Sequence, residues 1–84
     1  MAAPRAPVTL TPAQVEELAT RLSDFRHNIN NNLSLVVAAV ELIRRKPDLV
    51  ERMSERIMEQ PTRILAEVKT FSDFLEASLN IVRE

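Results

Sequence analysis

Apolar residues recur along the first half of the chain at alternating spacings of three and four positions. This spacing is a heptad seam sustained for about four repeats, and it predicts one long amphipathic helix. Three further aliphatic residues, Leu33, Val37 and Val40, widen the stripe as a helix bundle requires, beyond what a two-stranded coiled coil needs. The seam comprises Val15, Leu18, Leu22, Phe25, Ile29, Asn32, Val36, Ala39 and Ile43.

The first predicted helix has signals at both ends and covers residues 12–45. Thr11 can serve as its N-cap, Pro12 suits the first helical position, and Gln14 has the spacing of a capping box. At the other end, the basic residues of "RRKP" follow the seam and the proline stops the helix. Residues 1–10 contain two prolines and lack periodicity, so we expect a flexible N-terminal segment there.

A second amphipathic pattern predicts another helix over residues 49–83, after a turn at residues 46–48 and with Asp48 as its cap. Pro61 interrupts this pattern, and a proline inside a helix removes one hydrogen bond and usually produces a kink. Because the apolar pattern continues in phase across the proline, we expect one bent helix, with a break at Gln60 as the alternative. The stripe comprises Val50, Ile57, Ile64, Val68, Phe71, Leu75 and Val82, broadened by Met53, Leu65, Phe74, Leu79 and Ile81.

The width of the two stripes predicts how the helices associate. Two helices of about 33 residues, each roughly 50 Å long and joined by a short turn, become antiparallel neighbours. A two-helix hairpin cannot cover stripes this wide, and each Å² of apolar surface left in water costs about 25 cal/mol. The predicted fold is therefore all-α, an antiparallel helical hairpin that forms a homodimeric four-helix bundle. A monomeric hairpin is the alternative.

Composition agrees with one small helical domain and narrows the classes of function. The 84 residues include no glycine and no cysteine, which disfavours phosphate-binding loops and excludes disulfides and thiolate zinc sites. A net charge of −1 gives no electrostatic reason to expect a nucleic-acid partner. The longest apolar region, Leu33 to Ile43, is shorter than the ~20 residues of a membrane span. We expect a cytoplasmic protein with no membrane partner, no metal site and no cofactor in this chain.

The single histidine of the chain, His27, lies in the middle of the first predicted helix beside four asparagines. Because Phe25 and Ile29 belong to the seam, His27 takes the f position of the heptad and points to solvent. The surface around it is polar with few charges, so the imidazole is available to react. Asn32 falls on the seam itself, where an amide lowers stability but can fix register and partner number. A surface histidine with no role is the alternative interpretation.

The segment "FRHNINNNLSLVVAAVELI", residues 25–43, resembles the H-box of sensor histidine kinases. That motif runs Phe-x-His, then an acidic, an aliphatic and a polar residue, then Asn or Thr, often Pro, and then Leu. The second helix, "RILAEVKTFSDFLEASLNI", is similar to the partner helix of the dimerisation and phosphoacceptor domain of these kinases. The resemblance covers roughly residues 12–82. The matching motif positions are Phe25, His27, Ile29, Asn31 and Leu33.

The resemblance implies a dimeric four-helix bundle in which His27 is the phosphoacceptor. In this family the histidine attacks the γ-phosphoryl group of ATP, which a separate domain holds with Mg²⁺, and the group then passes to an aspartate of a response-regulator receiver domain. The receiver docks on the bundle below the histidine, towards the hairpin turn. A neutral imidazole is nucleophilic at physiological pH. Asn31 matches the residue that positions the attacking water in family members that also dephosphorylate their regulator.

Two positions depart from the family pattern. The residue after the histidine is acidic in the family, where it orients the imidazole and accepts its proton, but it is Asn28 here. An amide oxygen can accept a hydrogen bond from the ring but cannot take the proton, and losing a general base costs about 10²–10⁴-fold in rate. Asn32 replaces the usual proline, so we expect a straighter first helix. Without glycine, the chain has none of the family's glycine-rich nucleotide boxes, so alone it is not an autonomous kinase.

Three functions are compatible with these observations. The leading one is a phosphotransfer domain of two-component signalling, which relays phosphoryl groups between an ATP-binding domain and a receiver through His27. The second, suggested by Asn28, is a catalytically degenerate scaffold that dimerises and binds or sequesters receivers without phosphotransfer. The third is a plain helical dimerisation module. The chain is either a domain of a longer kinase or a stand-alone bundle.

Overall fold

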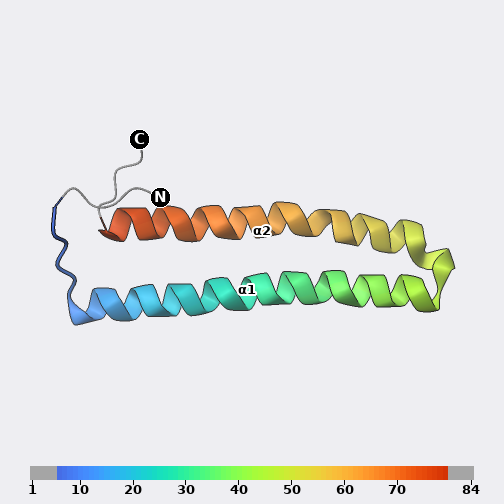
Figure 1. Ribbon diagram of the computed structural model, residues 1–84, viewed down its shortest axis with the longest axis horizontal. Helices are drawn as coiled ribbons and strands as arrows, with labels where there is room; N and C mark the ends of the chain where they lie inside the picture. The colour runs from blue at the N-terminus through green and yellow to red at the C-terminus, as the bar shows by residue number, and fades with distance from the viewer. Residues whose placement is uncertain (1–5, 80–84) are drawn as a thin grey trace.

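The computed structural model describes residues 6–79, and within them the chain forms two long antiparallel helices (Figure 1). Helix α1 spans Pro12–Arg45, a short 3₁₀ helix η1 spans Pro47–Leu49, and α2 spans Val50–Leu79. No strand occurs in this part of the chain. The predicted all-α helical hairpin is confirmed, and α1 covers the same residues as the first predicted helix. The predicted end of the second helix, at residue 83, lies outside the described residues.

The predicted capping box at the start of α1 is present. The Gln14 backbone N–H donates to the Thr11 hydroxyl at 3.2 Å, and the Thr11 backbone N–H donates to the Gln14 side-chain oxygen at 2.8 Å. Two of the backbone donors that a helix start leaves unpaired are thereby satisfied. At the other end, Arg44 and Arg45 occupy the last turn, where positive charge is favourable.

The turn between the helices is tighter than predicted. Lys46 is the single non-helical residue, and η1 continues directly into α2. Asp48 lies inside η1, so its predicted role as the cap of the second helix is wrong. An N-cap residue needs extended backbone in front of the helix, and here a helical turn occupies that place and leads straight into the first turn of α2.

Helix α2 runs through Pro61 without interruption, so the alternative break at Gln60 does not occur. Proline has no backbone N–H, and the carbonyl of Ile57 therefore lacks its usual intrahelical donor. Next to this weakened turn, the Gln60 side-chain nitrogen donates to the carbonyl oxygen of Arg56 at 3.2 Å. The side chain thus adds a hydrogen bond to the helix just before the proline.

The two helices meet along a seam in which polar residues take part. On α2, buried and half-buried residues recur three and four positions apart, and three members of this seam, Gln60, Glu67 and Ser78, are polar. Four residues, Asn32 and Ala39 on α1 and Met53 and Gln60 on α2, are the most buried among those described. The α2 seam comprises Met53, Ile57, Gln60, Ile64, Glu67, Phe71, Phe74 and Ser78.

Some residues predicted on the stripes lie outside this seam. Val50 and Val68 on α2 are exposed, and so are Val15 and Leu22 on α1. For Val68 the reason is one of phase, because it follows a seam residue and turns to the side of the hairpin. Towards the start of α1, Arg21 covers the ring of Phe74 with its guanidinium carbon 4.6 Å from the ring centroid.

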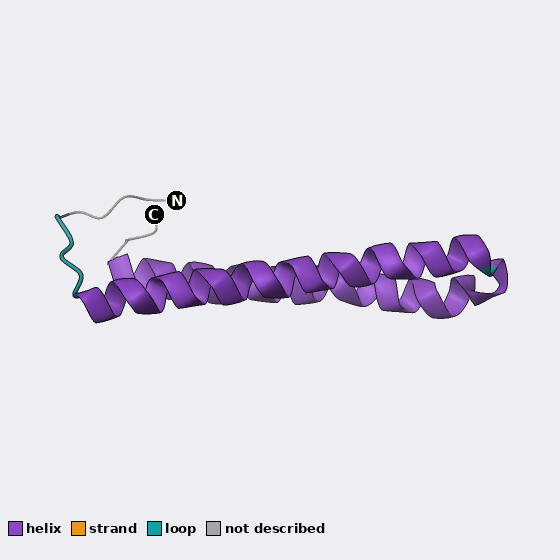
Figure 2. Ribbon diagram, turned by 90° about the horizontal axis from the view of Figure 1, so that it is seen from below, coloured by secondary structure: helices purple, strands orange, loops and turns teal. Residues whose placement is uncertain are grey.

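The hairpin is a single layer of two helices. It is 57 Å long and 12 Å thick along its shortest axis, and 12 Å is about the diameter of one helix with its side chains. Viewed edge-on, the two helices cross at a shallow angle (Figure 2). No side chain among residues 6–79 is completely buried. One hairpin therefore has a contact line between helices and no enclosed core. None of the described helices has a stretch long and apolar enough to cross a bilayer.

Candidate functional site

The position of a residue relative to the seam decides which side of the hairpin it occupies. On both helices, residues one position before a seam residue line open depressions along one side, which we call the groove face. Because the helices are antiparallel, residues one position after a seam residue share the opposite side. We call this opposite side the aliphatic face. Its exposed apolar residues are Leu33, Val37, Val40, Met58, Leu65 and Val68.

His27 belongs to neither face. It lies two positions after Phe25 and two before Ile29, which are both half-buried on the seam, so it occupies the outermost line of α1. The residue is exposed, as predicted, and no hydrogen bond or ion pair to its ring occurs within residues 6–79. The imidazole is therefore held by a rigid helix and open to any molecule that approaches from outside.

Asn28 turns from His27 towards the groove face. It lines two adjacent depressions, and Glu67 of α2 lines both of them as well. The second of these depressions also includes Asn31, Asn32 and Arg63. The structure thus brings Asn28 and Asn31 to one polar surface, while His27 lies just outside it. Among the three predicted site residues, the two amides share a depression and the imidazole does not line it.

Sequence reasoning missed two residues of this surface, Glu67 and Arg63. Glu67 is half-buried on the seam of α2, where the apolar stripe drew attention to Val68 instead. Between Ile64 and Phe71 the spacing allows either residue, but the alternation of three and four that begins at Met53 and Ile57 continues through Glu67 to Phe71 and Phe74. Arg63 precedes a seam residue and therefore lines the groove face.

The charges around the candidate site are weakly paired. Arg63 lies 3.7 Å from Glu59, and both side chains are more than half exposed, so the pair contributes little to stability. Within the described residues, no group of three or more His, Cys, Asp and Glu side chains is arranged to hold a metal ion.

Comparison with protein-family models, with curated proteins and with solved structures finds no match to this chain. The resemblance to the H-box therefore rests on the residues quoted above and on their places in the hairpin.

Proposed function

We propose that this chain is a dimerisation and histidine-phosphoacceptor domain of two-component signalling, with His27 as the phosphoryl site. One observation carries the proposal: the H-box-like motif is in phase with the helix seam. Phe25 and Asn32 face the second helix, while His27, between them in the motif, is exposed on the outer side of α1. A phosphoacceptor must meet a donor and then an acceptor domain, and an outward imidazole on a rigid helix is accessible to both.

The chemistry requires only that the ring be neutral and well placed. A lone pair of an imidazole nitrogen forms the N–P bond while the P–O bond to the departing ADP breaks, and the ring N–H proton is then lost to a base. In the next step, the phosphoryl group moves from the ring nitrogen to a carboxylate of the receiver, as the N–P bond breaks and a new P–O bond forms. ATP and Mg²⁺ belong to a separate domain in this scheme, and the present chain supplies the nucleophile and its orientation.

Asn28 determines how fast the first step is. Its amide oxygen can accept a hydrogen bond from the ring N–H and so select a tautomer, but it cannot accept the proton. The deprotonation must then fall to water or to a group of the partner domain. We therefore propose slow phosphorylation compared with a variant that carries a carboxylate at this position.

The aliphatic face is the surface through which we propose that two copies of the chain dimerise. Val37, Met58 and Leu65 are 61%, 72% and 68% exposed, and together with their neighbours they form an apolar side that spans both helices. Full burial of an aliphatic side chain contributes roughly 1.5–3 kcal/mol. A twofold mate packed on this face would bury it in a four-helix core, leaving His27 on the outside and the groove face open.

The acid and base stability of phosphate bound to the chain tests whether His27 is a phosphoacceptor. The chain is incubated with ATP, Mg²⁺ and a histidine kinase–receiver pair, and acid-labile, base-stable phosphate on the chain is measured. Because His27 is the only histidine, any phosphohistidine must be at this position. We expect labelling of the wild type and none of His27→Ala. Equal labelling of the two proteins would contradict the proposal.

A second candidate function is the scaffold that binds receivers without phosphotransfer, and the amide at Asn28 favours it. The variant Asn28→Asp separates the two functions when a kinase ATP-binding domain is supplied. If the carboxylate variant acquires phosphate and passes it to a receiver, the site is chemically competent. If both proteins bind receivers and neither acquires phosphate, the scaffold is the better description.

A further inference from the structure

A depression of the hairpin lies on the groove face near the turn. It has a volume of about 540 Å³ and two unlike walls. Leu35 and Leu42 of α1 line one wall, and both are more than 40% exposed. Arg52, Arg56 and Arg63 of α2 line the other. The groove therefore combines an apolar wall with a positively charged wall.

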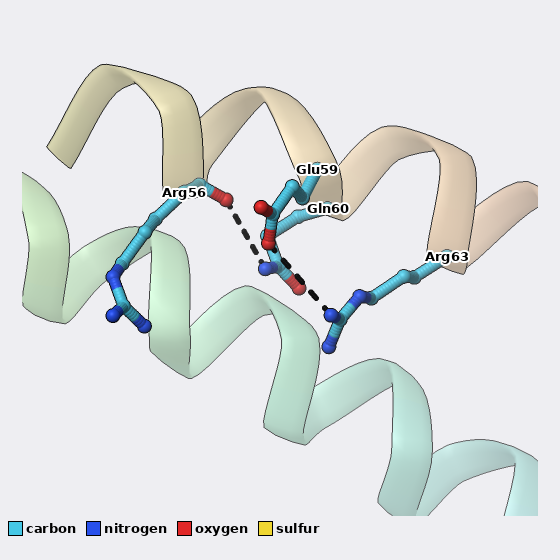
Figure 3. A network of polar contacts seen from close by, with 4 residues as sticks. All are labelled: Arg56, Glu59, Gln60 and Arg63. Atoms are coloured by element: carbon cyan, nitrogen blue, oxygen red, sulfur yellow. Dashed lines mark hydrogen bonds and ion pairs between the residues drawn. The ribbon is translucent and has the colours of Figure 1, made fainter. Parts of the chain in front are cut away.

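One of the three arginines that line the groove has an ion-pair partner among the described residues. Arg63 is paired with Glu59, at 3.7 Å, whereas no ion pair to Arg52 or Arg56 occurs within residues 6–79. Figure 3 shows the side chains of Arg56 and Arg63 extending from α2 towards α1, with the Gln60 amide between them. Arginine side chains at this spacing offer several donors to carboxylates that lie in the groove.

Gln60 provides an independent sign of a missing partner. The residue is 4% exposed, and its side-chain nitrogen donates to the Arg56 carbonyl oxygen. Its side-chain oxygen is buried without a hydrogen-bond donor. Buried amide oxygens in native proteins are nearly always satisfied, and a turn of this side chain towards the groove would let its oxygen accept an N–H or O–H from a bound partner.

We infer that the groove binds an acidic amphipathic helix of a partner protein. Arg56 and Arg63 are seven residues apart, about 10.5 Å along the helix, which equals two turns of a partner helix. Acidic residues two turns apart would meet these arginines, and leucines on the adjoining side would cover Leu35 and Leu42. The inference deepens the proposed function, since it specifies the chemistry of the helix that a partner domain presents on the half of the hairpin nearest the turn.

The structure favours a helix over a small anion. The arginines from Arg52 to Arg63 extend over about 16 Å of α2, which is the length of three helical turns. The space between two packed helices is also the ordinary seat of a third helix in a bundle. On the opposite side of the hairpin, the aliphatic face has no comparable line of arginines, so a second copy and a charged partner would use different sides.

Two matched peptides test the inference. Both are three-heptad amphipathic helices with the same leucine face, one with glutamates on its flanks and the other with lysines. Binding to the full chain is measured by fluorescence anisotropy at low salt and again at high salt. We expect the glutamate peptide to bind about tenfold or more tightly than the lysine peptide, with an advantage that shrinks as salt rises.

Charge reversal in the groove locates the binding site. The double variant Arg56→Glu with Arg63→Glu should lose about tenfold or more in affinity for the glutamate peptide and gain affinity for the lysine peptide. Lys69→Glu is the matched control, because Lys69 lies on α2 away from the groove and pairs with Asp73 at 2.7 Å. The affinity of the Lys69→Glu variant for both peptides should equal that of the wild type. Equal binding of both peptides to the wild type, or an equal loss in the Lys69 variant, would overturn the inference.

Gln60 supplies a readout that a merely structural role would not give. The variant Gln60→Leu should weaken the glutamate peptide only if that peptide presents a serine or asparagine opposite this position, and should leave an otherwise identical alanine peptide unaffected. The His27→Ala variant should bind both peptides as the wild type does. Loss of phosphorylation with intact peptide binding would count against the proposed function alone, and loss of peptide selectivity with intact phosphorylation would count against the groove partner alone.

Discussion

The rings of Phe25 and Phe71 stack across the two helices, with centroids 5.0 Å apart and planes inclined by 20°. Phe25 precedes His27 by two residues and is half-buried. The stack therefore fixes the rotation of α1 about its own axis at the level of the histidine. Because Phe25 faces inward here, His27 must face outward.

Removal of this stack should destabilise the hairpin near the histidine. We expect Phe71→Ala to lower the free energy of unfolding by about 3 kcal/mol, the lower end of the range for buried phenylalanines, since both rings remain partly exposed. Phe71→Leu keeps most of the volume and should cost less than about 1.5 kcal/mol. Thermal and urea unfolding followed by circular dichroism compare the two variants. Equal losses for the two variants would contradict this expectation, since they would show that the volume buried at this position does not determine the stability.

The aliphatic face should hold the dimer together. We expect the double variant Val37→Glu with Leu65→Glu to shift the protein from dimer to monomer, because each glutamate would otherwise be buried among apolar side chains without a partner. Sedimentation equilibrium at micromolar concentration measures the mass. Ser34→Glu, on the outer side of α1 one heptad beyond His27, is the control and should remain dimeric. A wild-type protein that is monomeric under the same conditions would contradict the proposed bundle.

The helices of this fold could be predicted because their signals are local. The capping box at Thr11 and the alternating seam each depend on residues close together in the sequence, and α1 has the bounds that they predict. The seam of α2 was harder to assign, because two of its members are Gln60 and Glu67 and an exposed valine, Val68, follows Glu67. Only the alternation followed over the whole helix, from Met53 to Phe74, selects Glu67, because the spacing between Ile64 and Phe71 fits Val68 equally well.

The candidate site was predictable only in part for the same reason. The direction of His27 follows from the helix period, and the structure agrees with it. The meeting of Asn28 with Glu67 and Arg63 depends on the register of two antiparallel helices. That register is set by contacts between residues far apart in the sequence, such as the stack of Phe25 on Phe71, and no local pattern in one helix contains it.

The buried Gln60 oxygen that lacks a hydrogen-bond donor should lower the stability of the hairpin relative to a variant with an apolar residue at this position. A buried acceptor without a donor costs about 1–3 kcal/mol, so we expect Gln60→Leu to raise the free energy of unfolding by about 1 kcal/mol, net of the lost bond to the Arg56 carbonyl. Urea unfolding measures the change. Thr62→Leu, at an exposed position two residues away, should shift stability by less than about 0.5 kcal/mol. A loss of stability in Gln60→Leu would show that this amide is satisfied in solution.

A carboxylate beside the histidine should speed its phosphorylation. We expect Asn28→Asp to raise the initial rate of phosphohistidine formation by about 10²-fold or more, because the new group can accept the ring proton that the amide cannot. Rapid-quench labelling with a supplied ATP-binding domain measures the rate. Asn30→Asp adds the same charge two residues further along α1 and serves as the control. Equal rates for Asn28→Asp and the wild type would show that this position does not contribute to proton removal.

Transfer of a phosphoryl group from His27 to a receiver tests the central claim most directly. His27 is first phosphorylated chemically with phosphoramidate, and the purified protein is mixed with a panel of receiver domains. Phosphorus NMR then follows the nitrogen-bound phosphate. The account predicts that at least one receiver removes this signal within minutes, far faster than free phosphohistidine transfers it, and that His27→Ala shows no signal at any time. A phosphohistidine that persists unchanged with every receiver would contradict the account.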